Sequence, residues 1–133
     1  MPPDARSREV AGEWLRRARS DLALAKQPKP EEVFWEDLCF HAEQAAEKAI
    51  KAVLVLERID FPRTRDVSEL LGLLAQAGHS VPADVLIAET ISDYASVTRY
   101  PGHRQPVGEE EYRRAVAVAE DVVRWAEGVV HVP

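Results

Sequence analysis

Short segments that contain proline or glycine divide this sequence into stretches whose apolar residues recur every three or four positions. This spacing places apolar side chains on one face of an α-helix. In the first stretch, from about Ser7 to Lys26, the residues on that face are Ala11, Trp14, Leu15, Ala18, Leu22 and Ala25. No stretch alternates apolar and polar residues in the way typical of a half-buried strand. The pattern therefore predicts an all-α protein.

The breaks predict five helices, over about residues 7–26, 31–58, 67–77, 80–99 and 109 onward. Pro30 precedes the second helix and Pro101 follows the fourth, because proline is tolerated at the start of a helix but disfavours helix at the residue before it. We expect Asp66 and Ser80 to cap the third and fourth helices, and Gly78 to end the third. A chain of 133 residues fits one domain over 1–133, with a core from about residue 7 to 130.

The second predicted helix carries two adjacent apolar stripes that are rich in alanine. One stripe contains Ala42, Ala45 and Ala49, and the other contains Ala46 and Ile50. So wide an apolar arc predicts close contact on two sides, either with other helices of the bundle or with a second protomer.

Charge and cysteine content limit the classes of function. A formal net charge of −6 argues against a generic grip on nucleic acid, although it leaves room for a local basic cleft. The single cysteine, Cys39, lies within an apolar helical pattern, so we expect a buried thiol and a reducing compartment. No apolar run approaches the ~20 residues that cross a bilayer, and no signal peptide is apparent. We therefore expect a cytoplasmic protein without a membrane segment.

The densest polar cluster is the predicted loop after the fourth helix, which contains Arg99, Tyr100, His103 and Arg104. Arginine can bind phosphate oxygens, histidine can transfer a proton near neutral pH, and tyrosine can stack on a base. These are the groups that a phosphodiester reaction would use. The same residues also have a structural explanation, in which Arg99 stabilises a helix C-terminus, Tyr100 covers the edge of the core, and the other two are solvated.

A second polar feature lies on the second predicted helix. Its residues are spaced by three, four and three positions and so project on one side: His41, Gln44, Lys48 and Lys51. This stripe is a candidate wall of a nucleotide- or RNA-binding cleft. The alternative is an ordinary solvated surface, because Glu47 and Lys51 have the spacing of a common helical ion pair.

Other signatures of catalytic or metal sites are absent from the sequence. There is no glycine-rich phosphate loop, no cysteine pair, no His-x-x-x-His spacing and no Gly-x-Ser-x-Gly motif. The four histidines are scattered over different predicted elements. We therefore expect neither a metal site nor a cofactor.

Three segments of the chain, in order, resemble the HEPN (higher eukaryotes and prokaryotes nucleotide-binding) domain. They are Ala18-Arg19-Ser20-Asp21-Leu22-Ala23-Leu24-Ala25, residues 39–52 with the run His41-Ala42-Glu43-Gln44-Ala45-Ala46-Glu47-Lys48, and Thr98-Arg99-Tyr100-Pro101. The resemblance implies an up-and-down four-helix bundle with a fifth helix, usually a homodimer. In many relatives it also implies a nucleotidyltransferase partner encoded nearby, the two forming a toxin–antitoxin module.

Catalytic members of the family that the chain resembles are metal-independent endoribonucleases with an Arg-(x)4 to 6-His motif at the dimer cleft. This sequence departs from that pattern, because only three residues separate Arg99 from His103. If the chain cleaves RNA, we expect Arg99 to bind the scissile phosphate, His103 to act as acid or base, and Tyr100 to stack on the substrate or accept a modification. The alternatives are a non-catalytic module that binds a nucleotide or a nucleotidyltransferase, and a structural helical homodimer.

Overall fold

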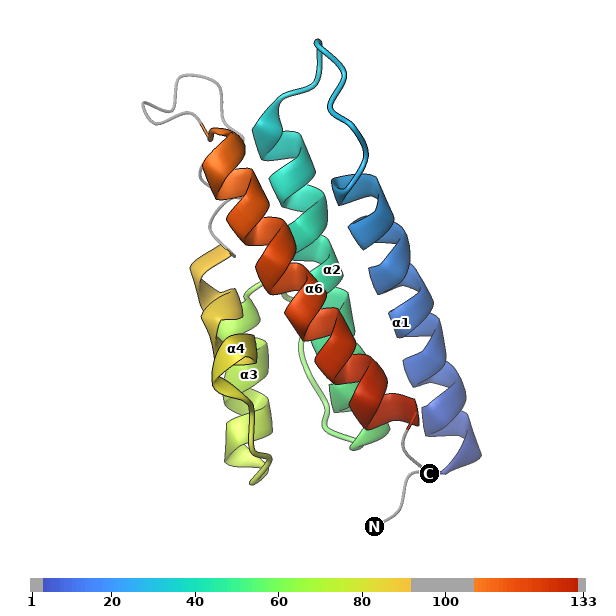
Figure 1. Cartoon of the computed structure of the whole chain (residues 1–133). Helices are drawn as coiled ribbons and strands as arrows, with labels where there is room; N and C mark the ends of the chain where they lie inside the picture. The colour runs from blue at the N-terminus through green and yellow to red at the C-terminus, as the bar shows by residue number, and fades with distance from the viewer. Residues whose placement is uncertain (1–3, 92–106, 132–133) are drawn as a thin grey trace.

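The computed structural model describes residues 4–91 and 107–131, and within these ranges it contains helices and no strand (Figure 1). This confirms the predicted all-α helical bundle. In the described part of the chain, no helix is long and apolar enough to cross a membrane. The helical elements are α1 (Ala5–Ala25), α2 (Trp35–Leu56), α3 (Val67–Gln76), α4 (Ala83–Leu86), the 3-10 helix η1 (Ile87–Ile91) and α6 (Glu109–His131).

Three long helices, α1, α2 and α6, lie side by side, and the shorter α3 and α4 pack beside α2 and α6 (Figure 1). The Tyr112 hydroxyl of α6 donates a hydrogen bond to the backbone carbonyl of Ala25 at 2.7 Å, and its ring packs on Trp35 with centroids 4.9 Å apart. Ion pairs of Arg19 with Glu127 and of Lys26 with Glu120 join α1 to α6. Together these contacts hold α1 antiparallel to α6.

The alanine-rich arc of α2 is buried within the chain. Ala42, Ala45, Ala46, Ala49 and Ala52 are each 0% exposed, and α2 contacts α1, α3, η1 and α6. Small side chains let neighbouring helices approach α2 closely on several sides. Of the two sequence-based alternatives, contact with other helices of the bundle is the one observed, so this face is not available to a second protomer.

Two predicted helix boundaries are wrong. The second helix begins at Trp35 rather than near Glu31, because residues 31–33 form a turn closed by a hydrogen bond from the Val33 amide to the Pro30 carbonyl at 3.1 Å. The fourth begins after Pro82, so Ser80 is not its cap. It winds as α4 for four residues and then tightens into η1, where the Thr90 hydroxyl donates to the Ile87 carbonyl at 2.7 Å. The remainder of that predicted helix, 92–99, lies outside the described residues.

The ends of α2 and α3 set the path of the connection between them. As predicted, Asp66 caps α3 by accepting a hydrogen bond from the Glu69 amide at 3.3 Å, and Gly78 follows its C-terminus with φ +86°. Helix α2 ends in the same way, although Arg58 occupies the left-handed position with φ +58°. The Ile59 amide then donates to the Leu54 carbonyl at 2.9 Å. This ending turns the chain back alongside α2.

Candidate functional site

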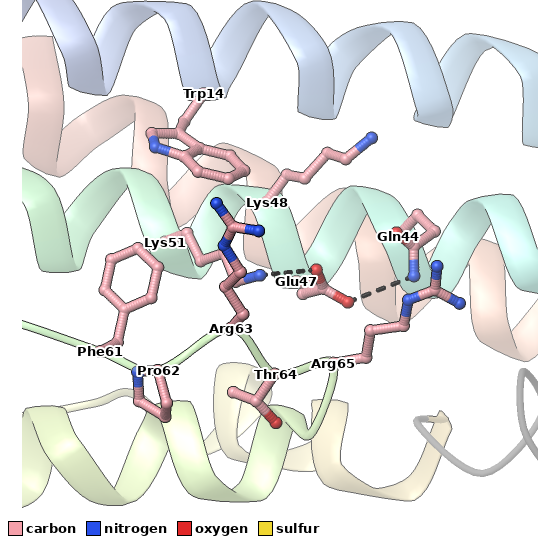
Figure 2. Close-up of a pocket in the computed structure, with 10 residues that line it drawn as sticks. All are labelled: Trp14, Gln44, Glu47, Lys48, Lys51, Phe61, Pro62, Arg63, Thr64 and Arg65. Atoms are coloured by element: carbon pink, nitrogen blue, oxygen red, sulfur yellow. Dashed lines mark hydrogen bonds and ion pairs between the residues drawn. The ribbon is translucent and has the colours of Figure 1, made fainter.

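A pocket of about 660 Å³ lies between α1, α2 and the connection of residues 57–66 (Figure 2). We call it the basic pocket. Its volume is within the range of about 300–1,000 Å³ that is typical of small-molecule sites. The residues that line it are Trp14, Gln44, Glu47, Lys48, Lys51, Phe61, Pro62, Arg63, Thr64 and Arg65.

The connection forms one wall of the basic pocket because it runs back along α2 (Figure 2). Phe61 lies opposite Lys51, whose ammonium is 5.7 Å from the ring centroid, and the Arg65 guanidinium lies 5.7 Å from the ring centroid of Phe40. Figure 2 shows Arg63 and Arg65 reaching toward α2, while Thr64 points away.

The side of the basic pocket formed by α2 is a buried polar network. Glu47, Lys51 and Gln44 are 4%, 7% and 8% exposed. The Lys51 ammonium donates to Glu47 Oε2 at 2.9 Å, and Gln44 Nε2 donates to Glu47 Oε1 at 3.2 Å. The same ammonium lies 5.5 Å from the Trp14 ring centroid. Lys51 and Glu47 therefore neutralise each other, and Lys48 is paired with Asp21, so the positive charge that remains in the pocket belongs to Arg63 and Arg65.

The two arginines of the connection are available to bind an anion. Both are exposed, and neither forms an ion pair with a carboxylate of residues 4–91 or 107–131. Several other cations of the surface are paired, as Arg19 is with Glu127 at 2.9 Å and Lys26 with Glu120 at 2.7 Å. Guanidinium groups without a carboxylate partner form strong, directional hydrogen bonds with phosphate or carboxylate ligands.

Lys48 links the basic pocket to a polar contact between α1 and α2. Its ammonium donates to Asp21 Oδ2 at 2.5 Å, and Asp21 Oδ1 lies 3.2 Å from His41 Nδ1. Asp21 is only 8% exposed. Its carboxylate therefore holds both Lys48 and His41 in place. His41 itself contacts Asp21 but does not line the basic pocket.

The site residues predicted from the sequence fall into two groups. Gln44, Lys48 and Lys51 come together in the basic pocket, and His41 joins them through Asp21. The other predicted residues, Arg99, Tyr100, His103 and Arg104, lie outside the described residues.

Sequence reasoning missed the opposite wall of the pocket, which is formed by Trp14, Phe61, Arg63 and Arg65. The available signal was the alternation Arg63-Thr64-Arg65 after Pro62 in a segment with no helical pattern.

Cys39 is fully buried, and that burial raises the pKa of its thiol to about 12, with smaller contributions from Glu111 and Glu36. A thiol in this state is a packing residue and not a nucleophile. No group of three or more His, Cys, Asp or Glu side chains that could hold a metal ion occurs among the residues described.

Comparison with known proteins agrees with this architecture. Residues 11–129 match the HEPN domain. The archaeal HEPN homologue ST0689 is 26% identical, with a TM-score of 0.72 over 90% of this chain and 97% of its own. TT1696 from Thermus thermophilus is 28% identical, with a TM-score of 0.73 over 90% and 97% of the two chains. No curated protein matches in sequence. Because the family match spans most of its length, this chain belongs to the HEPN domain family.

Proposed function

We propose that this HEPN-type protein is directed at nucleotides or RNA, and that it binds the phosphate of its ligand in the basic pocket. The observation that carries this proposal is the pair of exposed arginines, Arg63 and Arg65, which face α2 across the pocket without a carboxylate partner among the described residues. Membership of the HEPN domain family supports the choice of ligand.

The composition of the pocket suits a nucleotide better than a simple anion. Arg63, Arg65 and Lys48 offer donors for phosphate oxygens. Trp14 and Phe61 offer aromatic surface of the kind on which bases stack. Because the whole chain carries a net charge of −6, this cationic surface is a local exception, and ligands should be drawn to it rather than to the surface at large.

Equilibrium titration with a nucleotide and with a short single-stranded RNA tests the proposal. We expect the wild-type protein to bind at least one of them, and Arg65→Glu to weaken binding about tenfold or more. Arg114→Glu is the matched control, because Arg114 is an exposed arginine of α6 outside the pocket. Absence of binding to either ligand, or equal weakening by both variants, would contradict the proposal.

A second function, metal-independent endoribonuclease, is favoured by Arg99, Tyr100 and His103 in the sequence. In this proposal Arg99 binds the scissile phosphate, while His103 accepts the proton of the ribose 2′-hydroxyl. Purified protein should cleave RNA in the presence of EDTA, and Arg99→Ala and His103→Ala should each abolish cleavage. Equal cleavage by all three proteins would remove these residues from the mechanism.

The assembly that we propose is a cytoplasmic homodimer that pairs with a nucleotidyltransferase as the toxin-like half of a two-gene module. The resemblance of residues 18–25, 39–52 and 98–101 to the HEPN domain motivates this proposal. Light scattering at micromolar concentration should give the mass of a dimer. Co-expression with the product of an adjacent nucleotidyltransferase gene should give a stable complex. A monomer would contradict the proposed homodimer, and the absence of such a gene would contradict the proposed two-gene module.

A further inference from the structure

The two arginines of the basic pocket are presented by a segment whose ends are both fixed. At one end, Arg58 adopts the left-handed conformation that terminates α2, and its guanidinium pairs with Asp4. At the other end, the Asp66 amide donates to Thr64 Oγ1 at 3.0 Å. Because the backbone is held on both sides of Arg63 and Arg65, the two side chains leave the chain from fixed backbone positions. Such preorganisation lowers the entropic cost of binding an anion.

A third cation lies on α2, with its side chain directed toward α1 (Figure 2). Lys48 lines the same pocket and is oriented by its hydrogen bond to Asp21. The charge of Lys48 is compensated by Asp21, which leaves two guanidinium groups without a carboxylate partner among the described residues. Two such cations favour a ligand group with two negative charges over a group with one, since each cation gains from the additional charge. A phosphomonoester is close to a dianion at neutral pH, with a second pKa of about 6. An internal phosphodiester of RNA carries one charge.

The pocket also has an apolar side. Trp14 and Phe61 contact each other edge to face, with ring centroids 6.4 Å apart, and Pro62 continues this surface along the connection. Both rings are half-buried, so part of each remains open to a ligand. A base can pack on such a surface while its phosphate reaches the arginines.

The described surface next to the pocket does not continue as a basic track. Along α1, Arg17 pairs with Glu13 at 3.2 Å, and Arg16 pairs with the same carboxylate. At the start of α1, Asp4 takes up the charge of Arg58. Proteins that bind a strand along its length need a row of available cations to follow the backbone. The described residues therefore favour a ligand held at one point.

We propose that the basic pocket recognises a nucleoside phosphomonoester as a single unit, with the phosphate between Arg63, Arg65 and Lys48 and the base on Trp14. This inference rests on the proposed function and specifies its ligand. The same chemical group occurs in a free nucleoside monophosphate and at the phosphorylated end of an RNA, so the test includes both.

Calorimetry at constant ionic strength provides the test. The ligands are a nucleoside monophosphate, the corresponding nucleoside, and one short RNA with a 5′-phosphate, with a 3′-phosphate or with hydroxyl groups at both ends. We expect the monophosphate to bind with at least about tenfold higher affinity than the nucleoside, or a phosphorylated RNA to bind with at least about tenfold higher affinity than the RNA that ends in hydroxyl groups. The first result assigns the site to free nucleotides, and the second assigns it to RNA ends.

The variant Arg63→Gln/Arg65→Gln should lose this preference for the phosphomonoester, whereas Arg114→Gln should keep it. Arg63, Arg65 and Arg114 are all exposed, and thermal melting will verify that each variant folds. If all three RNAs bind equally, the free monophosphate does not bind, and Arg65→Glu still weakens RNA binding, this inference fails while the proposed function stands. If no ligand binds the wild-type protein, both fail. If the double variant keeps the preference, the site lies elsewhere and the inference is overturned.

Discussion

Lys51 illustrates how a single side chain supports the basic pocket. Its spacing from Glu47 is that of an ordinary surface ion pair, yet the two side chains are only 9% and 5% exposed. The ammonium lies between the carboxylate and the rings of Trp14 and Phe61. A buried charge is costly unless it is paired, so each partner depends on the other. Lys51 is therefore better placed to support the pocket than to bind the ligand.

Replacing Lys51 by methionine should destabilise the protein by about 3 kcal/mol, because the Glu47 carboxylate stays buried with Gln44 as its remaining donor. The double variant Glu47→Gln/Lys51→Met should recover much of this loss, since it leaves no uncompensated charge. Urea unfolding of wild type, both single variants and the double variant would measure the coupling. If Lys51→Met lowered the unfolding free energy by less than about 0.5 kcal/mol, the Glu47–Lys51 pair would contribute no more than an exposed surface ion pair.

The raised pKa of Cys39 leads to a prediction for how stability depends on pH. Burial raises this pKa from 9.0 to about 12, so the folded protein keeps the thiol proton where the unfolded chain loses it. The contribution of Cys39 to stability is therefore fully present below about pH 9 and is lost as the pH rises toward 12. Relative to Cys39→Ala, wild type should lose up to about 1.4 kcal/mol of unfolding free energy per pH unit in this window. If the unfolding free energies of the two proteins changed in parallel with pH, this prediction would be disproved.

At the level of elements, the end of α2 decides where the pocket forms, and α3 ends in the same way. Both helices end with a residue of positive φ, Arg58 and Gly78, followed by an amide that bonds back into the last turn, Ile59 to Leu54 and His79 to Leu74. The turn at Arg58 reverses the chain. The segment that follows then runs along α2 toward its N-terminus, with Phe61 near Lys51 and Arg65 near Phe40.

Two glycines of the α3 region should respond to alanine in opposite directions. Gly78 has φ +86°, a conformation that L-residues rarely adopt, so Gly78→Ala should destabilise the protein by about 1 kcal/mol. Gly72 lies within α3 and has no atom within 4 Å of an added Cβ, so Gly72→Ala should stabilise by up to about 1 kcal/mol. Chemical denaturation compares the two variants, and changes of the same sign would refute this account of the helix end.

On the scale of the whole molecule, the basic pocket joins three parts of the chain that are distant in sequence. Trp14 comes from α1, Lys48 from α2 and Arg63 from the connection. A ligand that bridges them binds the folded state alone, because the unfolded chain does not assemble these groups. Ligand binding and global stability should therefore be coupled.

Ligand at about 100 times its Kd should raise stability by about 2.7 kcal/mol, which corresponds to roughly 10 °C in Tm for a chain of this size. The shift should shrink as salt is raised, because Arg63 and Arg65 are exposed and their attraction for phosphate is screened. Scanning calorimetry at low and high ionic strength provides the measurement, with Arg63→Gln/Arg65→Gln as the control without a shift. A shift that is independent of salt would speak against recognition through these charges.

The amino-acid sequence determined the local features of this protein. Helical periodicity, the Asp66 cap and the Gly78 terminus depend on residues within a few positions of one another, so they can be read along the chain. The resemblance of residues 18–25, 39–52 and 98–101 to the HEPN domain was also visible there, and the family match confirms it. The left-handed turn at Arg58 could not be predicted, because arginine carries no preference for positive φ.

Only the tertiary structure decided which polar residues face one another. The spacing of Glu47 and Lys51 indicated their ion pair but not its burial. Nothing in the stripe indicated that Lys48 is held by Asp21 from α1. Nor did the stripe indicate that Arg63 and Arg65 would face it. These relations join residues far apart in the chain, and they depend on how helices pack and where the connection reverses. Local patterns carry no information about either.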